Sequence, residues 1–418
     1  MCCNPIRRFA MQLPIAKRLP FLNLLLFYKL RCMIVTGLDV LLRNLDMLRH
    51  RSVGLLVNQT SLTASMEYSW QLLQKQGITI RRIFSPEHGL FATEQDQIAV
   101  SYQPELGCDM VSLYGDSAAT LVPDMALLDD LDVVIFDIQD VGARYYTYVN
   151  TLALFMEAIA GRDIELMVLD RPNPLGGEIV EGPMLDMAFG SFVGVFPVPV
   201  RHALTAGELA VLYRDVMQLD VNLRIIKMEG WKRTMLYGET GLPWIPPSPN
   251  MPTVATAEVY PGMCLFEGLN VSEGRGTTTP FQLSGAPFIH PIELAERCHS
   301  YGLEGVRFRP VWFKPTFHKF AGEVIGGIWQ QVTDARRYRS FATAVAMTAA
   351  LRELYGEQVT FLRGVYEFND TIPAFDLLAG NATIRTAIES GNTIHTLLTL
   401  WQKDEAQFAE TKTRYHLY

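Results

Sequence analysis

The chain has 418 residues, a formal net charge of −8 at pH 7 and a pI near 5.6. Single hydrophobic cores stop growing near about 250–300 residues, so this length predicts two domains. Hydrophobic residues make up 49% of the chain and charged residues 19%, which indicates a packed globular protein and excludes a disordered one. The acidic balance argues against nucleic-acid binding through a broad basic surface.

Residues 1–32 are basic and contain no acid. Their apolar run, 21–27, is interrupted by Asn23 and is too short for a stable membrane span. It could be the core of a signal peptide, but no A-x-A-like cleavage site follows it. The alternatives are an N-terminal extension that forms a flexible arm, and a natural start at Met33. We therefore favour a cytoplasmic location and keep periplasmic or secreted export as the alternative.

Apolar runs alternate with helical patterns through the middle of the chain. Continuous apolar runs suit strands that are buried on both faces of a parallel sheet. Thr205, with Glu208 three residues later, is a typical helix start. The expected strands are 53–57, 78–84, 133–138 and 166–169, and the expected helices are 66–76, 145–160 and 205–218. This alternation predicts an α/β fold.

Polar residues follow each apolar run. In open parallel sheets, ligands bind outside the carboxyl ends of the strands. Asn58, Glu87, Asp140 and Asp170 are therefore expected along one edge of the sheet.

Residues 243–285 are dominated by Pro and Gly, and are expected to form a long loop whose interspersed aromatic residues keep it ordered. The rest of the chain mixes strands (306–308, 323–329) with helices (336–355, 383–402). We therefore divide the chain into an extension at 1–32, a Rossmann-like catalytic domain at 33–278 and an α+β domain at 279–418.

Cysteine and histidine spacings predict neither a disulfide framework nor a metal centre. The cysteines at 2, 3, 32, 108, 264 and 298 form no C-x-x-C pair and are interpreted as free thiols. No two histidines lie within four residues of each other, so the H-E-x-x-H type of site is absent. No G-x-G-x-x-G follows the first run, and no G-x-S-x-G is present. We expect no cofactor.

The segment Ser85–Gly89 (SPEHG) places a carboxylate beside His88, directly after an expected buried strand. A glycosidase needs a carboxyl group that can protonate a leaving oxygen, and Glu87 would be partly screened from water by apolar neighbours. The alternative is a turn in which Glu87 caps the next helix.

The segment 137–150 (DIQDVGARYYTYVN) concentrates acids, tyrosines and an arginine after another strand. Tyr145 and Tyr148 are expected on one helical face, and aromatic rings suit the apolar side of a pyranose. Asp140 could serve as a second carboxylate or orient the sugar. Alternatively, Asp140 caps the helix and the tyrosines belong to the core.

Two later segments carry charges beside Gly and Pro. Arg201 and His202 precede the helix expected at 205, a favourable place for an anion, although a lone His there is more often structural. The Gly-rich SEGRGTTTPFQ contains Glu273 and Arg275, and Arg275 could hold a substrate carboxylate with two hydrogen bonds. His318, in FKPTFHKF, is more simply interpreted as part of a strand edge.

Together, SPEHG, DIQDVGARYYTY, DRPNPLGG, PVRH…TAGELA, PPSPNMPT, YPGMCLFEGLNVSEGRGTTTPFQ and KPTFHKFAG resemble the NamZ-type exo-β-N-acetylmuramidase family over about residues 33–418. The resemblance implies a Rossmann-like parallel-sheet domain, a smaller α+β C-terminal domain and a site in the cleft between them. It implies release of N-acetylmuramic acid from the non-reducing end of peptidoglycan fragments, with the catalytic glutamate at Glu87. Ala203 stands where a Gly is expected, which leaves the geometry of His202 in doubt.

We therefore expect Glu87 to protonate the glycosidic oxygen. The second group is Asp140, Glu273 or the acetamido oxygen of the substrate, and retention or inversion stays open. The alternatives are a non-catalytic sugar-binding protein and a metal-dependent amidase or deacetylase.

A site that pairs the lactyl carboxylate of N-acetylmuramic acid would reject sugars that lack it. Arg275, Arg201 and Arg144 are the candidate partners. The residues expected to bind this small-molecule substrate are Asn58, His88, Gln139, Arg144, Tyr145, Asp170, Arg201, His202, Asn250, Arg275 and Thr277.

Overall fold

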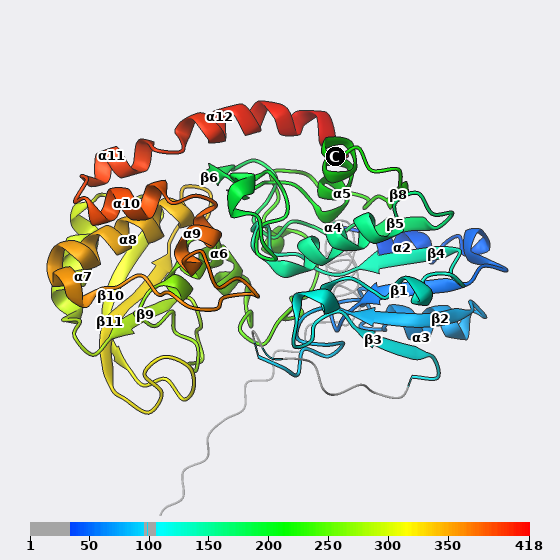
Figure 1. Ribbon diagram of the computed structural model, residues 1–418, viewed down its shortest axis with the longest axis horizontal. Coiled ribbons are helices and arrows are strands. Elements are labelled where there is room, and N and C mark those ends of the chain that lie inside the picture. The colour runs from blue at the N-terminus through cyan, green and yellow to red at the C-terminus, as the bar shows by residue number, and fades with distance from the viewer. Residues whose placement is uncertain (1–33, 96–97, 99–105) are drawn as a thin grey trace, which may run out of the picture.

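A computed structural model describes residues 34–95, 98 and 106–418 (Figure 1). The expectations for residues 1–32 lie outside this part of the chain. No helix in the described part is long and apolar enough to cross a membrane.

The N-terminal half is built on a six-stranded parallel sheet in the order β3-β2-β1-β4-β5-β8. The strands are β1 (Val53–Val57), β2 (Ile80–Ser85), β3 (Asp109–Ser112), β4 (Val133–Asp137), β5 (Glu165–Leu169) and β8 (Asn222–Ile226). The four apolar runs predicted as strands are confirmed as its central neighbours, which confirms the α/β class. The edge strands β3 and β8 were missed because they are partly exposed and mix polar with apolar residues, so they lack a continuous apolar run.

Residues along each central strand alternate between two cores, as the period of two in a strand requires. Leu56, Phe84 and Phe136 belong to the core that also contains residues of α4 (Thr147–Ile159) and α5 (Ala206–Val216). Leu55 and Ile135 belong to the core beneath α2 (Gly37–Leu41) and α3 (Ser69–Lys75). Helices therefore cover both faces of the sheet, and the expected helices at 66–76, 145–160 and 205–218 are confirmed with shorter bounds.

The C-terminal half holds a three-stranded antiparallel sheet, β10-β11-β9, with helices around it (Figure 1). Its elements are α6 (Val254–Met263), β9 (Leu283–Ala286), α7 (Pro291–Ser300), β10 (Val306–Phe313), β11 (Ile325–Val332), α8 (Ser340–Tyr355), α9 (Ala374–Ala379), α10 (Thr383–Glu389), α11 (Ile394–Thr399) and α12 (Gln402–Thr411). A short antiparallel pair, β6 (Glu181–Met184) and β7 (Pro199–Arg201), lies in sequence between β5 and β8 of the N-terminal half. The smaller α+β domain is confirmed.

Two expectations for this half are wrong. The segment 243–285 is not one long loop, because it contains α6 and the start of β9. The side chain of Thr253 caps α6, and Gly262 packs so closely on α8 that a Cβ there would overlap Ser340 O. The helix expected at 383–402 is divided into α10 and α11, with residues 390–393 between them.

The last helices cross back from the C-terminal half to the sheet domain (Figure 1, red). The side chain of Asp404 in α12 accepts a hydrogen bond from Met184 N. Beyond α12, the Tyr418 hydroxyl donates to Asp170 Oδ2 at 2.8 Å, and Leu417 N donates to Glu208 at 2.8 Å. These contacts join the halves on the side of the sheet domain that carries α5.

Candidate functional site

A pocket of about 470 Å³ lies where the sheet domain meets the C-terminal half. We call it the Glu87 pocket. Its described lining consists of Glu87, His88, Tyr145, Tyr146, Thr147, Val193, Ser248, Asn250, Met251, Tyr260, Glu267, Arg275, Phe281, Tyr366 and Glu367.

Glu87 is presented by a tight turn after β2. Gly89 N donates to Pro86 O at 3.0 Å, and His88 and Gly89 both take the left-handed conformation, with φ of 68° and 80°. His88 Nδ1 lies 3.0 Å from Glu94 O, which fixes the imidazole. The Glu87 side chain is therefore held at the pocket wall, where only 4% of its surface is exposed.

The loop between β4 and α4, with the start of α4, supplies further residues of the pocket lining. Gly142 N donates to Asp140 Oδ2 at 2.7 Å, and Gly142 has a φ of 83°. A Cβ at this glycine would overlap the Asn173 side chain. This turn leads the chain into Tyr145 and Thr147, whose hydroxyl donates to Glu87 Oε2 at 2.6 Å. Asp140 thus shapes the loop that carries the pocket residues.

Tyr145 and Tyr148 were expected on one face of a helix, but the structure places them differently. Tyr145 lies before α4, and its hydroxyl bonds to the Pro261 carbonyl of α6, while Tyr148 donates to Pro247 O at 2.5 Å. They therefore do not share one helical face. Tyr145 still lines the pocket and ties it to the C-terminal half.

Arg275 also lines the pocket and is paired with two carboxylates. Its Nη2 lies 2.5 Å from Glu267 Oε1, its Nε lies 3.4 Å from Glu273 Oε1, and its guanidinium lies over the Phe281 ring at 5.0 Å. Lys319 Nζ donates to Glu273 Oε2 at 3.0 Å. Two cations and two anions of this network therefore largely compensate each other.

Glu273 lies behind this network and does not line the Glu87 pocket. Burial alone would raise its pKa, but the charges of Lys319, His318 and Arg275 hold the pKa of its carboxyl far below the usual range. A carboxylate that keeps its charge so firmly is suited to orienting Arg275 and unsuited to exchanging protons. Thr277, in the same loop, bonds to Gly274 O and also lies outside the lining.

Asp140 and His202 form a buried pair outside the lining. His202 Nε2 lies 3.9 Å from Asp140 Oδ2, and His202 Nδ1 accepts from Leu204 N at 3.2 Å. Burial raises the pKa of Asp140 to about 7, against hydrogen bonds from Gly142 and Val141, while burial and nearby Arg144 and Arg201 lower the pKa of His202 to about 3. The imidazole is therefore neutral. Ala203 follows it with a φ of 57°, a conformation that favours glycine.

Arg144 and Arg201 lie away from the pocket, with backbone carbonyls as partners. Arg144 is fully buried and donates to Pro183 O, Val198 O and Leu378 O, which joins the two halves. Arg201 donates to Leu175 O and lies 3.8 Å from Glu181. Both guanidiniums are thus committed to the fold, and Arg275 is the arginine among the described lining residues.

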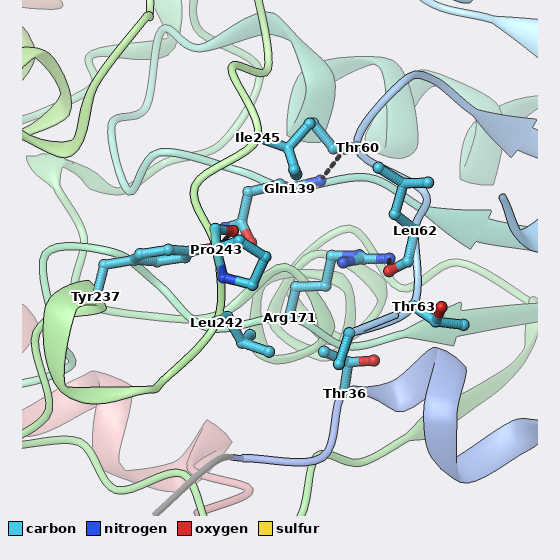
Figure 2. Close-up of a pocket in the computed structure, with 11 residues that line it drawn as sticks. Thr36, Thr60, Leu62, Thr63, Gln139, Arg171, Tyr237, Leu242, Pro243 and Ile245 are labelled. Atoms are coloured by element: carbon cyan, nitrogen blue, oxygen red, sulfur yellow. Dashed lines mark hydrogen bonds between the residues drawn. The ribbon is translucent and has the colours of Figure 1, made fainter. Parts of the chain in front are cut away.

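The carboxyl edge of the central strands holds a second, smaller pocket of about 340 Å³. Figure 2 shows its lining: Thr36, Thr60, Leu62, Thr63, Ala64, Gln139, Arg171, Tyr237, Leu242, Pro243 and Ile245. Parallel sheets of this kind commonly bind ligands at the point where the strand order reverses, here between β1 and β4. In this chain the Arg171 side chain lies at that point of the sheet. It donates hydrogen bonds to Asp137 Oδ1 at 2.6 Å and to Leu62 O at 3.0 Å.

The other strand-end residues predicted for the site also serve the fold. Asn58 Oδ1 accepts from Thr60, and Gln139 Nε2 donates to Asp140 O and Pro172 O. Asp170 accepts from Thr205, Gly207 N and Tyr418; burial raises its pKa to about 6 against these bonds. The four strand ends do lie along one edge, since β1, β2, β4 and β5 are parallel neighbours. Of the four predicted strand-end residues, Asn58, Glu87, Asp140 and Asp170, only Glu87 lines the Glu87 pocket.

Of the predicted residues, the structure brings together Glu87, His88, Tyr145, Asn250 and Arg275 in one pocket. It adds residues that the sequence analysis missed, above all Glu267, Tyr366 and Glu367. Glu267 follows YPGMCLF in a segment that was recognised, so its position could have been found from the motif. Tyr366 and Glu367 come from a turn far along the chain, and no local pattern marks them. Among the described residues, no group of three His, Cys, Asp or Glu side chains could hold a metal ion.

Comparisons with known proteins agree with this architecture. Residues 53–255 match the model of the N-terminal domain of exo-β-N-acetylmuramidase NamZ, and residues 258–418 match that of its C-terminal domain. The chain is 41% identical to the peptidoglycan β-N-acetylmuramidase NamZ of Bacillus subtilis (strain 168) over 387 residues, which is 92% of this chain and 91% of the relative.

Two crystal structures of DUF1343 family proteins from Bacteroides fragilis NCTC 9343 are also similar. One has a TM-score of 0.82 at 31% identity and covers 93% of this chain and 99% of its own. The other has a TM-score of 0.72 at 28% identity, and the match covers 92% of this chain and 99% of the Bacteroides chain. With both family models matched in order and a relative at 41% identity, the chain belongs to the exo-β-N-acetylmuramidase NamZ family.

Proposed function

We propose that Glu87 is the carboxyl group that protonates the glycosidic oxygen when this chain hydrolyses its substrate. Membership of the NamZ family makes the protein a glycosidase, an exo-β-N-acetylmuramidase that acts on peptidoglycan-derived saccharides. The catalytic role of Glu87 within that activity is our proposal. The division of the chain near residue 278 also stays a prediction.

One observation carries the proposal: Glu87 is almost fully buried at the wall of a pocket lined by both halves of the chain, with one oxygen bonded to Thr147. Protonation of the leaving oxygen by a positioned carboxyl group is the step that most glycosidases share. The C1–O bond breaks, its electron pair stays on the leaving oxygen, and that oxygen takes the proton of Glu87. The oxygen of a water molecule then bonds to C1, and the proton that this water releases restores the protonated enzyme. His88, Tyr145 and Asn250 line the same pocket and are the proposed sugar contacts.

Arg275 is the proposed partner of the lactyl carboxylate. It is the arginine of the described lining, it lies over the Phe281 ring, and Glu267 and Glu273 orient it. A guanidinium can bind a carboxylate through two parallel hydrogen bonds. The carboxylates of Glu267 and Glu273 weaken the electrostatic attraction between Arg275 and a further anion. We therefore expect Arg275 to contribute more to the choice between sugars with and without a lactyl carboxylate than to overall affinity.

The experiment measures release of a chromophore from a synthetic N-acetylmuraminide. We expect turnover by the intact protein, and for Glu87→Gln a loss of at least about 100-fold in kcat with substrate binding retained. Glu94→Gln is the matched control, because Glu94 lies in the same loop but does not line the pocket. Binding without turnover by the intact protein would identify a sugar-binding protein instead. Turnover that a chelator abolishes would identify a metal-dependent enzyme.

A further inference from the structure

A strained turn brings a glutamate of the C-terminal half into the Glu87 pocket. Tyr366 N donates to Asn369 O at 2.8 Å, and Asn369 N donates to Tyr366 O at 3.0 Å, which closes a two-residue hairpin turn. Its two central residues, Glu367 and Phe368, both have positive φ, of 45° and 65°. Turns of this kind strongly favour Asn-Gly, because most side chains strain the backbone there. The sequence therefore holds Glu-Phe at two positions where local stability would select other residues.

Contacts with the sheet domain hold this turn in place. The Phe368 ring packs on Tyr114 and Phe192, with centroids 5.5 Å and 6.4 Å apart. The Tyr114 hydroxyl donates to Glu367 Oε2 at 3.0 Å. Tyr114, which follows β3, thus contacts both strained residues. Backbone strain of this kind persists only where the surroundings enforce it, and it gathers at functional sites.

Three further carboxylates lie in or near the pocket: Glu267, Asp140 and Glu273. Glu267 has both oxygens in use, with Oε1 on Arg275 and Oε2 accepting from Tyr366 at 2.5 Å. Asp140 and Glu273 do not line the pocket. Glu367 lines it and is 7% exposed. Of the described carboxylates that line the pocket, Glu87 comes from the sheet domain, whereas Glu267 and Glu367 come from the C-terminal half.

We infer that Glu367 is the second catalytic carboxylate of this glycosidase and that Tyr114 is its positioning residue. This inference rests on the proposed role of Glu87. As the leaving oxygen takes the proton of Glu87 and keeps the electron pair of the broken bond, positive charge develops on C1 and the ring oxygen of the sugar. The carboxylate of Glu367, which lines the same pocket, would stabilise that charge, as one member of the carboxylate pair does in most glycosidases.

The first test replaces the charge and keeps the shape. With the chromogenic N-acetylmuraminide, Glu367→Gln is expected to lower kcat by about 100-fold or more and to change KM by less than about threefold. Circular dichroism and a thermal melt establish that the variant is folded. Turnover within about threefold of the parent in a folded Glu367→Gln protein would overturn the inference.

The second test separates catalysis from stability. Glu367→Gly removes the carboxylate and suits a φ of 45°, so the melting temperature should stay the same or rise while kcat is lost. Gln218→Gly is the matched control, because Gln218 is exposed, has a φ of 53° and lies after α5. It should show the same direction of melting shift with unchanged kcat. A Glu367→Gly protein that is less stable yet fully active per folded molecule would assign Glu367 to the fold and overturn the inference.

The third test asks whether Tyr114 acts through Glu367. Tyr114→Phe should lower kcat by about tenfold in the parent and have no further effect in Glu367→Gln, because coupled residues are not additive. It should also shift the acidic limb of the kcat/KM pH profile, which a loss of packing would not do. Equal losses in both backgrounds would remove Tyr114 from the catalytic arrangement.

The outcomes separate this inference from the one on which it rests. If the intact protein turns over and Glu87→Gln does not, the role of Glu87 stands, and an active Glu367→Gln protein then overturns only the role of Glu367. If Glu87→Gln keeps full turnover, the proposed mechanism fails and the assignment of Glu367 as its second carboxylate fails with it.

Discussion

The hydroxyl of Thr147 donates a 2.6 Å hydrogen bond to Oε2 of Glu87, and this bond joins the start of α4 to the turn after β2. Both residues are buried, so the bond is shielded from water. A typical hydrogen bond within a protein contributes about 0.5–1.5 kcal/mol to stability. It fixes one oxygen of the carboxyl group and therefore the direction in which Glu87 can meet a substrate.

Thr147→Val keeps the shape of the side chain and removes this bond. We expect kcat to fall by about tenfold or more with little change in KM, because Glu87 loses its orientation. Steady-state kinetics on the chromogenic substrate measure this. Thr151→Val is the control, since Thr151 lies one turn later in α4 and donates only to Thr147 O. Equal effects of the two changes would mean that the helix, and not the bond, is responsible.

Asp140 predicts a pH dependence of stability. Because burial raises its pKa to about 7 in the folded protein, the folded state holds a proton that the unfolded state releases near pH 4. Its contribution to stability is thus full below about pH 4 and is lost as the pH rises towards 7. Urea unfolding should show that Asp140→Asn loses less free energy of unfolding over this window than the parent, by up to about 1.4 kcal/mol per pH unit. Parallel pH curves for the two proteins would contradict this.

A comparison of alanine variants at Gly142 and Gly161 can separate steric overlap from backbone strain as causes of lost stability. Its φ is 83°, and a Cβ there would overlap the Asn173 side chain, whereas Gly161 has a φ of 73° and open space around it. Gly161→Ala should lose only about 1 kcal/mol for the left-handed backbone. Gly142→Ala should lose about 1–3 kcal/mol more and should also lower activity, because the loop that carries Thr147 shifts. Chemical denaturation and kinetics on both variants provide the measurement.

The Arg171–Asp137 pair predicts that the pocket in Figure 2 serves stability. Arg171→Met leaves Asp137 buried without its cation and should cost about 3–5 kcal/mol, while the double variant with Asp137→Asn should recover much of the loss. Activity per folded molecule should stay near that of the parent. The exposed pair Arg43–Glu229 is the comparison, and Arg43→Met should cost at most about 1 kcal/mol. A folded Arg171→Met protein without activity would instead assign this pocket to the reaction.

Arg275 predicts selectivity for the lactyl group. Arg275→Ala should lower kcat/KM for an N-acetylmuraminide about 10–100-fold more than for the matching N-acetylglucosaminide, because only the former carries a carboxylate. Arg275→Lys should give an intermediate result, since lysine keeps the charge but not the two-bond geometry. Equal losses on both substrates would refute the proposed contact.

The sequence by itself determined the central sheet, because runs such as Val53–Val57 are apolar throughout and only a strand buried on both faces needs that. It also located Glu87, since the polar residues after a parallel strand must lie at the carboxyl edge, and it placed Arg275 in a Gly-rich loop. The capped start of α5 at Thr205 was equally local, because the cap is made within four residues.

Only the tertiary structure decided which charged residues reach the pocket. Arg144, Arg201 and Asp170 carry the same chemical groups as the charged residues that line the pocket, but hydrogen bonds to residues 234, 26 and 248 positions away in sequence turn them towards the fold. Glu367 is the converse case, because a strained turn held by Tyr114, 253 residues away, carries it into the pocket. The local sequence therefore shows which chemical groups a residue offers. Long-range packing decides whether a charged residue faces the pocket or the core, because the partners that satisfy a buried charge come from distant parts of the chain.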